Sequence, residues 1–190
     1  MAFHHADHFR PYGMETPDLS QYMMGKKCWA RVVHCHDGDS PTIVLPLDLD
    51  LDLDVGGDVG GDVGGKMMRF NTRLYGIDTC EITSKVPANR DIAVRGRNRL
   101  LELIMGAQLP SGTPLNTRKD IQALLASDVY LVWVECMEMD KYGRVLVKMS
   151  ARDGLQSFAD ILVAERLAYP YFGATKLTEA EQLSALIMIM

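Results

Sequence analysis

CWARVVHCHDGDSPTIVLPL, residues 28–47, alternates apolar and polar residues on both sides of a short polar sequence. Alternation with a period of two is typical of a strand that buries one face. The polar sequence HDGDSP, at 36–41, contains the Asp, Gly, Ser and Pro residues that favour a reversal of the chain. We therefore expect two antiparallel strands joined at this turn.

The rest of the chain predicts three more strands and the helices that cover them. In order we expect a strand at 67–81, a helix at 87–106, a short helix at 121–127, a hairpin over 128–151 with its turn at DKYGR, a helix at 154–168 and a final helix at 178–190. A closed barrel hides the edges of such short strands. The expected fold class is α+β, mainly β: a closed five-stranded antiparallel barrel of the oligonucleotide-binding (OB) type, capped by about three helices.

The composition is that of an ordinary globular domain, with 190 residues, 47% hydrophobic and 24% charged. No apolar stretch is long enough for a membrane helix, and the start has neither the basic nor the apolar part of a secretory signal. The four cysteines are far apart and form no C-x-x-C pair, so we expect reduced thiols. These features predict an intracellular, cytoplasmic monomer with no membrane partner.

A block of two short repeats, LDLDLDLDVGGDVGGDVGGK at 47–66, distorts the charge of the chain. The net charge is −5, but the block contains six Asp and one Lys, so 19 basic and 19 acidic residues remain without it. The block is similar to Gly/Asp-rich Ca²⁺-binding repeats, although three copies of four residues are too few to form such a coil. A solvated low-complexity loop is favoured, and an added strand ribbon over LDLDLD stays possible.

Three short motifs contain the residue types of a catalytic site. They are DGDS at 37–40, RLYGIDTCE at 73–81 and DKYGR at 140–144. Each motif alone is explained by an ordinary turn or loop. Together, in this order and followed by DGLQSFADILVAERLAY, they resemble the staphylococcal nuclease (thermonuclease) family over roughly residues 27 to 175.

The resemblance implies a single Ca²⁺ site. Asp39 and Asp78 would supply carboxylates, and Thr79 would supply its backbone carbonyl. Ca²⁺ prefers such hard oxygen ligands, which excludes the neighbouring Cys80.

The resemblance also implies the catalytic and nucleotide-binding residues. Glu81 would activate the attacking water, and Arg73 and Arg144 would hold the scissile phosphate through planar guanidinium groups. The residues expected to contact the nucleotide are Lys141, Tyr142, Tyr169 and Tyr171. The activity implied is Ca²⁺-dependent hydrolysis of DNA and RNA, preferably single-stranded or frayed and with little sequence specificity, at P–O5′ bonds to leave 3′-phosphate ends.

The sequence departs from the family pattern at two places. Cys80 stands where the family has proline, which predicts a less rigid loop around Glu81. Ser40-Pro41 follows Asp39 where the family has threonine. Neither departure removes a catalytic side chain. The alternative is a weakly or non-catalytic domain of this kind that serves as a nucleic-acid- or protein-binding module.

The repeat block coincides with a difference in spacing. Asp39 and Arg73 stand 34 positions apart, and removal of the 20-residue block leaves 14, the spacing that the resemblance implies. We therefore expect an arm at 1–25, a nuclease-like domain at 26–176 with 47–66 inserted in a β-hairpin, and a helical tail at 177–190.

We expect surface positions rather than metal binding for the histidines outside the motifs. His34 and His36 flank Cys35 on a strand, which predicts one shared surface face. The three N-terminal histidines have no nearby cysteine to complete a transition-metal site.

Overall fold

The computed structural model describes residues 19–47, 66–112 and 114–187. Its elements in chain order are α2 (Leu19–Met23), β1 (Lys27–Cys35), β2 (Pro41–Leu47), β3 (Lys66–Leu74), β4 (Ile77–Asp78), α3 (Pro87–Met105), α4 (Arg118–Ala126), β5 (Leu131–Met139), β6 (Val145–Ser150), α5 (Phe158–Ala164), β7 (Tyr169–Pro170) and α6 (Glu179–Ile187). Five helices therefore occur within the described ranges, against about three expected. None of them is both long and apolar enough to cross a membrane.

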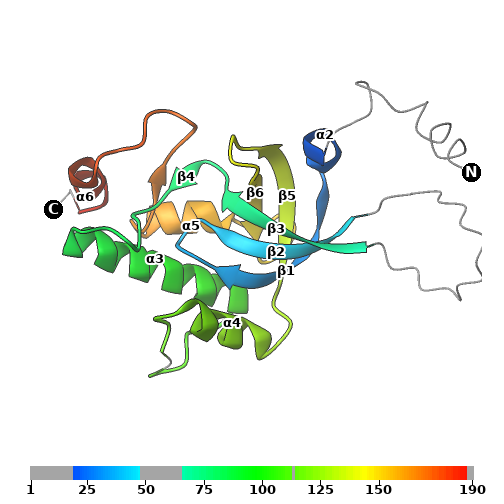
Figure 1. The fold of residues 1–190 in the computed structure, drawn as a ribbon, viewed down its shortest axis with the longest axis horizontal. Coiled ribbons are helices and arrows are strands. Elements are labelled where there is room, and N and C mark those ends of the chain that lie inside the picture. The colour runs from blue at the N-terminus through cyan, green and yellow to red at the C-terminus, as the bar shows by residue number, and fades with distance from the viewer. Residues whose placement is uncertain (1–18, 48–65, 113, 188–190) are drawn as a thin grey trace, which may run out of the picture.

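Five strands close into a barrel in the order β1-β2-β3-β6-β5 (Figure 1). The α+β fold class and the OB-type barrel are thereby confirmed. The expectation of a wholly antiparallel barrel is wrong, because β3 and β6 run parallel, with Thr72 opposite Val145 and Leu74 opposite Val147. A parallel pair needs a long crossover connection, and the chain from β4 through α3, α4 and β5 provides it.

The strands β2 and β3 are paired from Thr42 opposite Asn71 to Leu47 opposite Lys66. The segment 48–65 thus connects two residues that are register partners. The interpretation of the repeats as a solvated loop falls outside the described residues.

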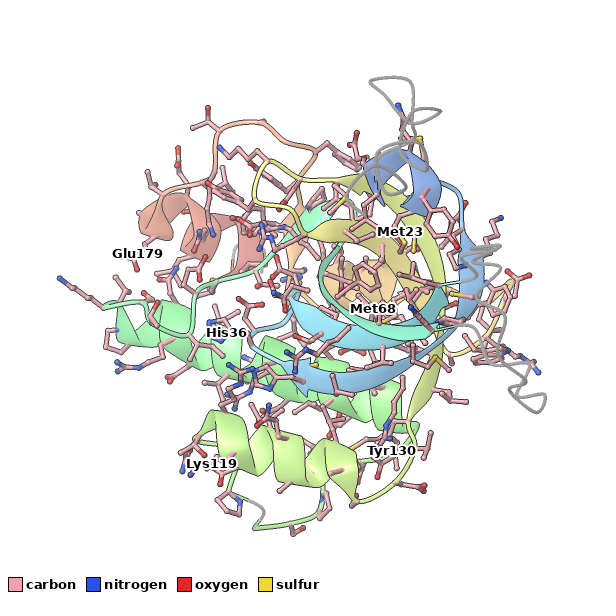
Figure 2. All side chains as sticks on the ribbon, turned by 45° about the vertical axis from the view of Figure 1, so that its right-hand side comes forward. Met23, His36, Met68, Lys119, Tyr130 and Glu179 are labelled. Carbon is pink, nitrogen blue, oxygen red and sulfur yellow. The ribbon has the colours of Figure 1, made fainter. Side chains whose placement is uncertain are left out.

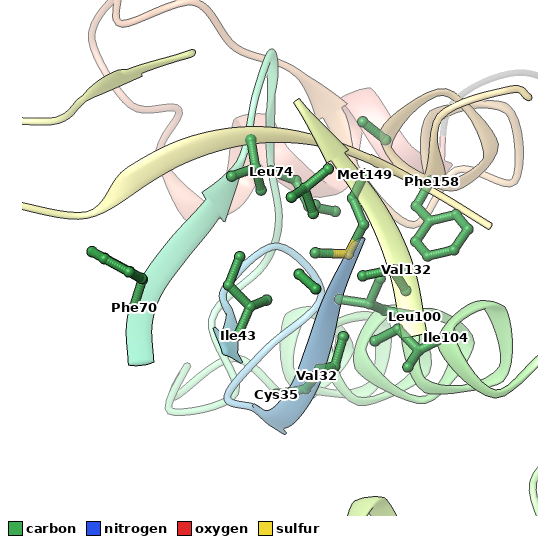
Figure 3. Packing of buried hydrophobic residues seen from close by; sticks show 14 of the residues in the cluster. Val32, Cys35, Ile43, Phe70, Leu74, Leu100, Ile104, Val132, Met149 and Phe158 are labelled. Atoms are coloured by element: carbon green, nitrogen blue, oxygen red, sulfur yellow. The ribbon is translucent and has the colours of Figure 1, made fainter. Parts of the chain in front are cut away.

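The barrel core is formed by the alternate residues predicted to face inward. Val32, Ile43 and Val132 are fully buried from three different strands, and Figure 3 shows them packed with Leu100 of α3 and Phe158 of α5. The helix α5 is shorter than expected, because Ser157 caps it and the chain before it is not helical. The expected helix start at residue 154 is therefore wrong, and Leu155 lies outside the helix and is 48% exposed.

Part of the N-terminal arm is ordered against the barrel. Met23 in α2 is fully buried in the core cluster (Figure 2), and Gly25 N–H donates to the carbonyl of Cys136. Cys136 N–H in turn donates to the carbonyl of Lys26. The expectation of a loose arm to residue 25 is therefore wrong for 19–25, because Met23 is buried in the core and Gly25 is hydrogen-bonded to β5. Residues 1–18 fall outside the described part.

A β-bulge in β1 changes the expected position of His34. The register shifts between Val32 and His34, so His34 and Cys35 are both buried although they are adjacent. An extra residue in one strand breaks the alternation of faces. The predicted surface role is therefore wrong for His34, whereas His36 is exposed.

Candidate active site

The residues of the three motifs meet at one end of the barrel. Asp39 follows the β1–β2 turn, Arg73 lies near the end of β3, Asp78 ends β4, and Arg144 follows the β5–β6 turn. Glu81 lies in the loop before α3. Arg73, Glu81 and Arg144 line the same two adjacent hollows, so segments far apart in the sequence contribute to one site.

The β1–β2 turn lies close to α3, and a glycine makes this approach possible. A Cβ atom on Gly38 would lie 3.1 Å from the backbone of Gly96 and 3.1 Å from the Thr79 methyl group. A side chain at Gly38 would therefore push the turn, and Asp39 with it, away from Thr79.

Arg73 joins the two carboxylates that the sequence assigns to a metal. Its Nη2 atom lies 2.9 Å from Asp39 Oδ2 and also donates to Asp78 Oδ1. Both carboxylates are almost fully buried, and the Arg73 side chain is 16% exposed. The contact with Asp39 is an ion pair whose angles do not fit a hydrogen bond. Asp39 Oδ2 therefore has no hydrogen-bond donor among the described residues.

The two buried carboxyls differ in their proton affinity. Burial, followed by the charge of Asp37, holds the pKa of Asp39 well above its usual range, despite Arg73. Burial also favours a higher pKa for Asp78, but a hydrogen bond from Tyr169 and the charges of Arg73 and Lys176 outweigh it, so that pKa is lowered. Asp39 is therefore the carboxylate that most lacks positive charge.

The donor set fits a hard cation. Asp39 and Asp78 offer buried carboxylate oxygens, and Thr79, itself buried, offers a backbone carbonyl. Within the described ranges no group of three or more His, Cys, Asp or Glu side chains has metal-binding geometry. The Ca²⁺ ligands expected from the resemblance include only two such side chains, Asp39 and Asp78. They are therefore too few to count as a group of three.

Tyr169 has a different place from the one expected. It is 3% exposed, its hydroxyl donates to Asp78 Oδ2, and Gln182 of α6 donates to that hydroxyl at 3.3 Å. A ring so buried cannot stack on a base, and its contact orients the carboxylate instead. Tyr171 lines the larger hollow, with its ring centroid 5.7 Å from the guanidinium carbon of Arg73.

Lys176, in the loop after β7, was missed by the sequence analysis. Its Nζ atom donates to Glu81 Oε1 and lies 3.3 Å from Asp78 Oδ2. Burial would lower the pKa of Lys176, but the hydrogen bond to Glu81 and the charge of Asp78 raise it, so the lysine is firmly protonated. No motif marks a single lysine in a loop, and its position becomes apparent only when β7 pairs with β4.

Arg144 is held in place by its own hairpin. Asp140 Oδ2 accepts a hydrogen bond from Nε of Arg144 at 2.7 Å and lies 2.7 Å from Nη2, and Asp140 Oδ1 accepts from the backbone N–H of Tyr142 and of Arg144. Burial favours a higher pKa for Asp140, but these hydrogen bonds outweigh it and lower that pKa. The Tyr142 ring is exposed, and its centroid lies 5.6 Å from Arg144 and 5.1 Å from Lys141 Nζ.

The larger hollow, of about 810 Å³, combines these charges with aromatic rings. We call it the aromatic pocket; its rings are Tyr75, Tyr142, Tyr171 and Phe172. Phe172 contacts Tyr75 edge-on, with centroids 6.0 Å apart, and was also missed by the sequence analysis. Gly76 makes room for it, since a Cβ atom there would lie 3.1 Å from the Phe172 ring.

The loop around Cys80 is well packed. Its side chain is fully buried against Ile92, Tyr169 and Leu186, and its sulfur accepts from Asn89 at 3.6 Å. The expectation of a less rigid loop is therefore not supported, because packing replaces the restraint of proline.

No protein-family model matches the chain, and no curated protein sequence matches it either. The functional interpretation therefore depends on the three motifs and on the geometry of their side chains.

Proposed function

We propose that this protein is a Ca²⁺-dependent phosphodiesterase that hydrolyses DNA and RNA at P–O5′ bonds to leave 3′-phosphate ends. The observation that carries the proposal is the convergence of two buried carboxylates, a third carboxylate and two arginines on two adjacent hollows, which share Arg73, Glu81 and Arg144. This combination suits a reaction that needs a metal, a general base and anion binding.

Each residue has a role in the proposed hydrolysis. Asp39, Asp78 and the Thr79 carbonyl would hold Ca²⁺, which when bound supplies positive charge to the phosphate and orients water. Arg73 and Arg144 would donate to the non-bridging phosphate oxygens, on which negative charge grows in the transition state. Glu81 would accept the proton of the attacking water once Lys176 shifts from its carboxylate.

The aromatic pocket favours an unpaired nucleotide as substrate. The rings of Tyr142 and Phe172 are 72% and 73% exposed, so a base can stack on either without displacing core residues. Stacking is tolerant of sequence, and Lys141 adds a charge for the backbone. The proposed substrate is therefore single-stranded or frayed DNA or RNA.

A second candidate, a nucleic-acid-binding module with little turnover, is favoured by one contact. Glu81 is paired with Lys176, and a paired carboxylate is less available as a base. Digestion assays separate the two candidates.

The decisive assay measures digestion of single-stranded DNA with Ca²⁺, with and without chelator. We expect chelator to abolish digestion, and Glu81→Gln and Arg144→Ala each to slow it by about 100-fold or more. Asp91→Asn and Arg95→Ala are the matched controls, since both residues are exposed on α3 and neither lines a hollow near the site. Parent-like digestion by both site variants would show that the assigned site is wrong.

A further inference from the structure

A second hollow, of about 390 Å³, adjoins the aromatic pocket and shares Arg73, Glu81 and Arg144 with it. Its own residues come from the β1–β2–β3 sheet and from the first residue of α4. We call it the polar groove and define it by His34, His36, Thr42, Asn71 and Arg118. Figure 2 shows His36 and the end of α4 that carries Lys119 on the same side of the molecule.

The two hollows differ in their chemistry. The aromatic pocket has four rings of Tyr and Phe, whereas the lining of the polar groove contains none. The groove instead offers the polar atoms of two imidazoles and of Thr42 and Asn71; the Thr42 hydroxyl donates to Asn71 Oδ1 at 3.3 Å. Exposed Arg118 adds a full positive charge. Such a lining suits a sugar–phosphate backbone better than a stacked base.

His34 supplies an independent sign of a missing ligand. Its side chain lines the groove and is 8% exposed, yet Nδ1 is buried with no hydrogen-bond partner among the described residues. A buried polar atom without a partner is costly, so such an atom beside a hollow marks a place for a ligand or water. Burial lowers the pKa of His34, and the nearby positive charge of Arg118 adds to this effect.

We propose that the polar groove binds the phosphate next to the scissile one, on the side of the substrate opposite to the aromatic pocket, with Arg118 as its main charged contact. This inference rests on the proposed function. Arg73 and Arg144 line both the aromatic pocket and the polar groove. A nucleic-acid strand whose scissile phosphate lies between these arginines therefore has one neighbouring nucleotide in each hollow. Asp37 and Asp39 also line the groove, and a cation held by Asp39 would offset their charge.

The test uses three small ligands with one internal phosphodiester each: TpT, pTpT with an added 5′-phosphate, and TpTp with an added 3′-phosphate. Their affinities are measured by titration calorimetry with Ca²⁺ in the Glu81→Gln background, which prevents cleavage during the titration. We expect each added phosphate to tighten binding by about threefold to tenfold, the range of a charged hydrogen bond near a surface.

Arg118→Gln should abolish the gain in affinity that one of the added phosphates provides and preserve the gain in affinity from the other. Lys141→Gln, in the aromatic pocket, should show the reverse selectivity. Lys119→Gln is the matched control, because it removes the same charge from the next residue of α4, which does not line the groove. Thermal unfolding of each variant verifies that it is folded.

Two outcomes would overturn the inference: both gains survive Arg118→Gln, or both fall equally. The proposed function is judged separately, from digestion of DNA by the parent protein. A parent that digests DNA while Arg118→Gln leaves both gains intact contradicts the groove alone, and a parent that cannot digest DNA contradicts the proposed function.

Discussion

The two ends of α3 pack against different parts of the molecule. Its C-terminal half places Leu100, Leu101 and Ile104 in the barrel core, where the contacts are apolar. Its N-terminal half places Ile92 and Ala93 in a smaller cluster with Cys80, Tyr169 and Leu186. Figure 1 shows α6 beside this end of α3. We call this second region, formed by β4, β7, the start of α3 and α6, the cap.

Polar contacts hold the cap together. Asn89 is fully buried and donates to the Glu179 carbonyl at 3.0 Å and to Gln182 at 3.2 Å, both from α6. The cap positions Asp78 and Glu81, whereas the barrel positions Asp39, Arg73 and Arg144. We therefore expect truncation of a side chain in the barrel core to cost more stability than loss of a single polar contact in the cap.

The largest effect is expected from Leu100→Ala in the barrel half of α3. The side chain is fully buried, so truncation removes apolar contacts and leaves a cavity. We expect the free energy of unfolding to fall by about 3 kcal/mol, measured by urea denaturation. A loss no larger than that of an exposed leucine such as Leu155→Ala would contradict the central place of the barrel core.

A smaller effect is expected from Tyr169→Phe in the cap. This change removes the hydroxyl that donates to Asp78, at a cost of about 1–2 kcal/mol. The folded-state pKa of Asp78 is lowered, so its contribution to stability is present above its unfolded pKa and is lost as the pH falls through the folded pKa. The difference between parent and Tyr169→Phe should therefore be full at neutral pH and vanish in acid, as followed by unfolding at a series of pH values. A difference that is independent of pH would mean that the hydroxyl does not act through Asp78.

These two residues also illustrate what the sequence can predict. Leu100 belongs to a helical apolar pattern, and the alternation in 28–47 likewise predicts which strand residues face the core. The contact between Tyr169 and Asp78 spans 91 positions and depends on the pairing of β4 with β7. Local patterns do not encode such pairings, so the sequence did not indicate that Tyr169 contacts Asp78.

Asp39→Asn should have an effect of opposite sign. The folded-state pKa of Asp39 is raised, so its contribution to stability is present below its unfolded pKa and is lost as the pH rises through the folded pKa. Asparagine resembles the protonated form, so with chelator present at neutral pH we expect a melting temperature about 3 °C higher than that of the parent. Added Ca²⁺ should stabilise the parent but not Asp39→Asn, because the variant lacks a metal carboxylate. Equal stabilisation of both proteins by Ca²⁺ would remove Asp39 from the metal site.

The smallest effect is expected from Lys176→Met, which tests the cap at its contact with the site. The ammonium group lies 3.3 Å from Asp78 Oδ2, so a cation bound by Asp78 has a like charge beside it. Lys176 is 41% exposed, and repulsion in such surroundings is screened to roughly 1 kcal/mol. We therefore expect Lys176→Met to bind Ca²⁺ about fivefold more tightly in titration calorimetry. Lys85→Met is the control, since Lys85 is exposed near the same loop and lines neither hollow. Weaker Ca²⁺ binding in Lys176→Met alone would show that Lys176 supports the metal site by orienting Glu81 and Asp78 rather than competing with the cation.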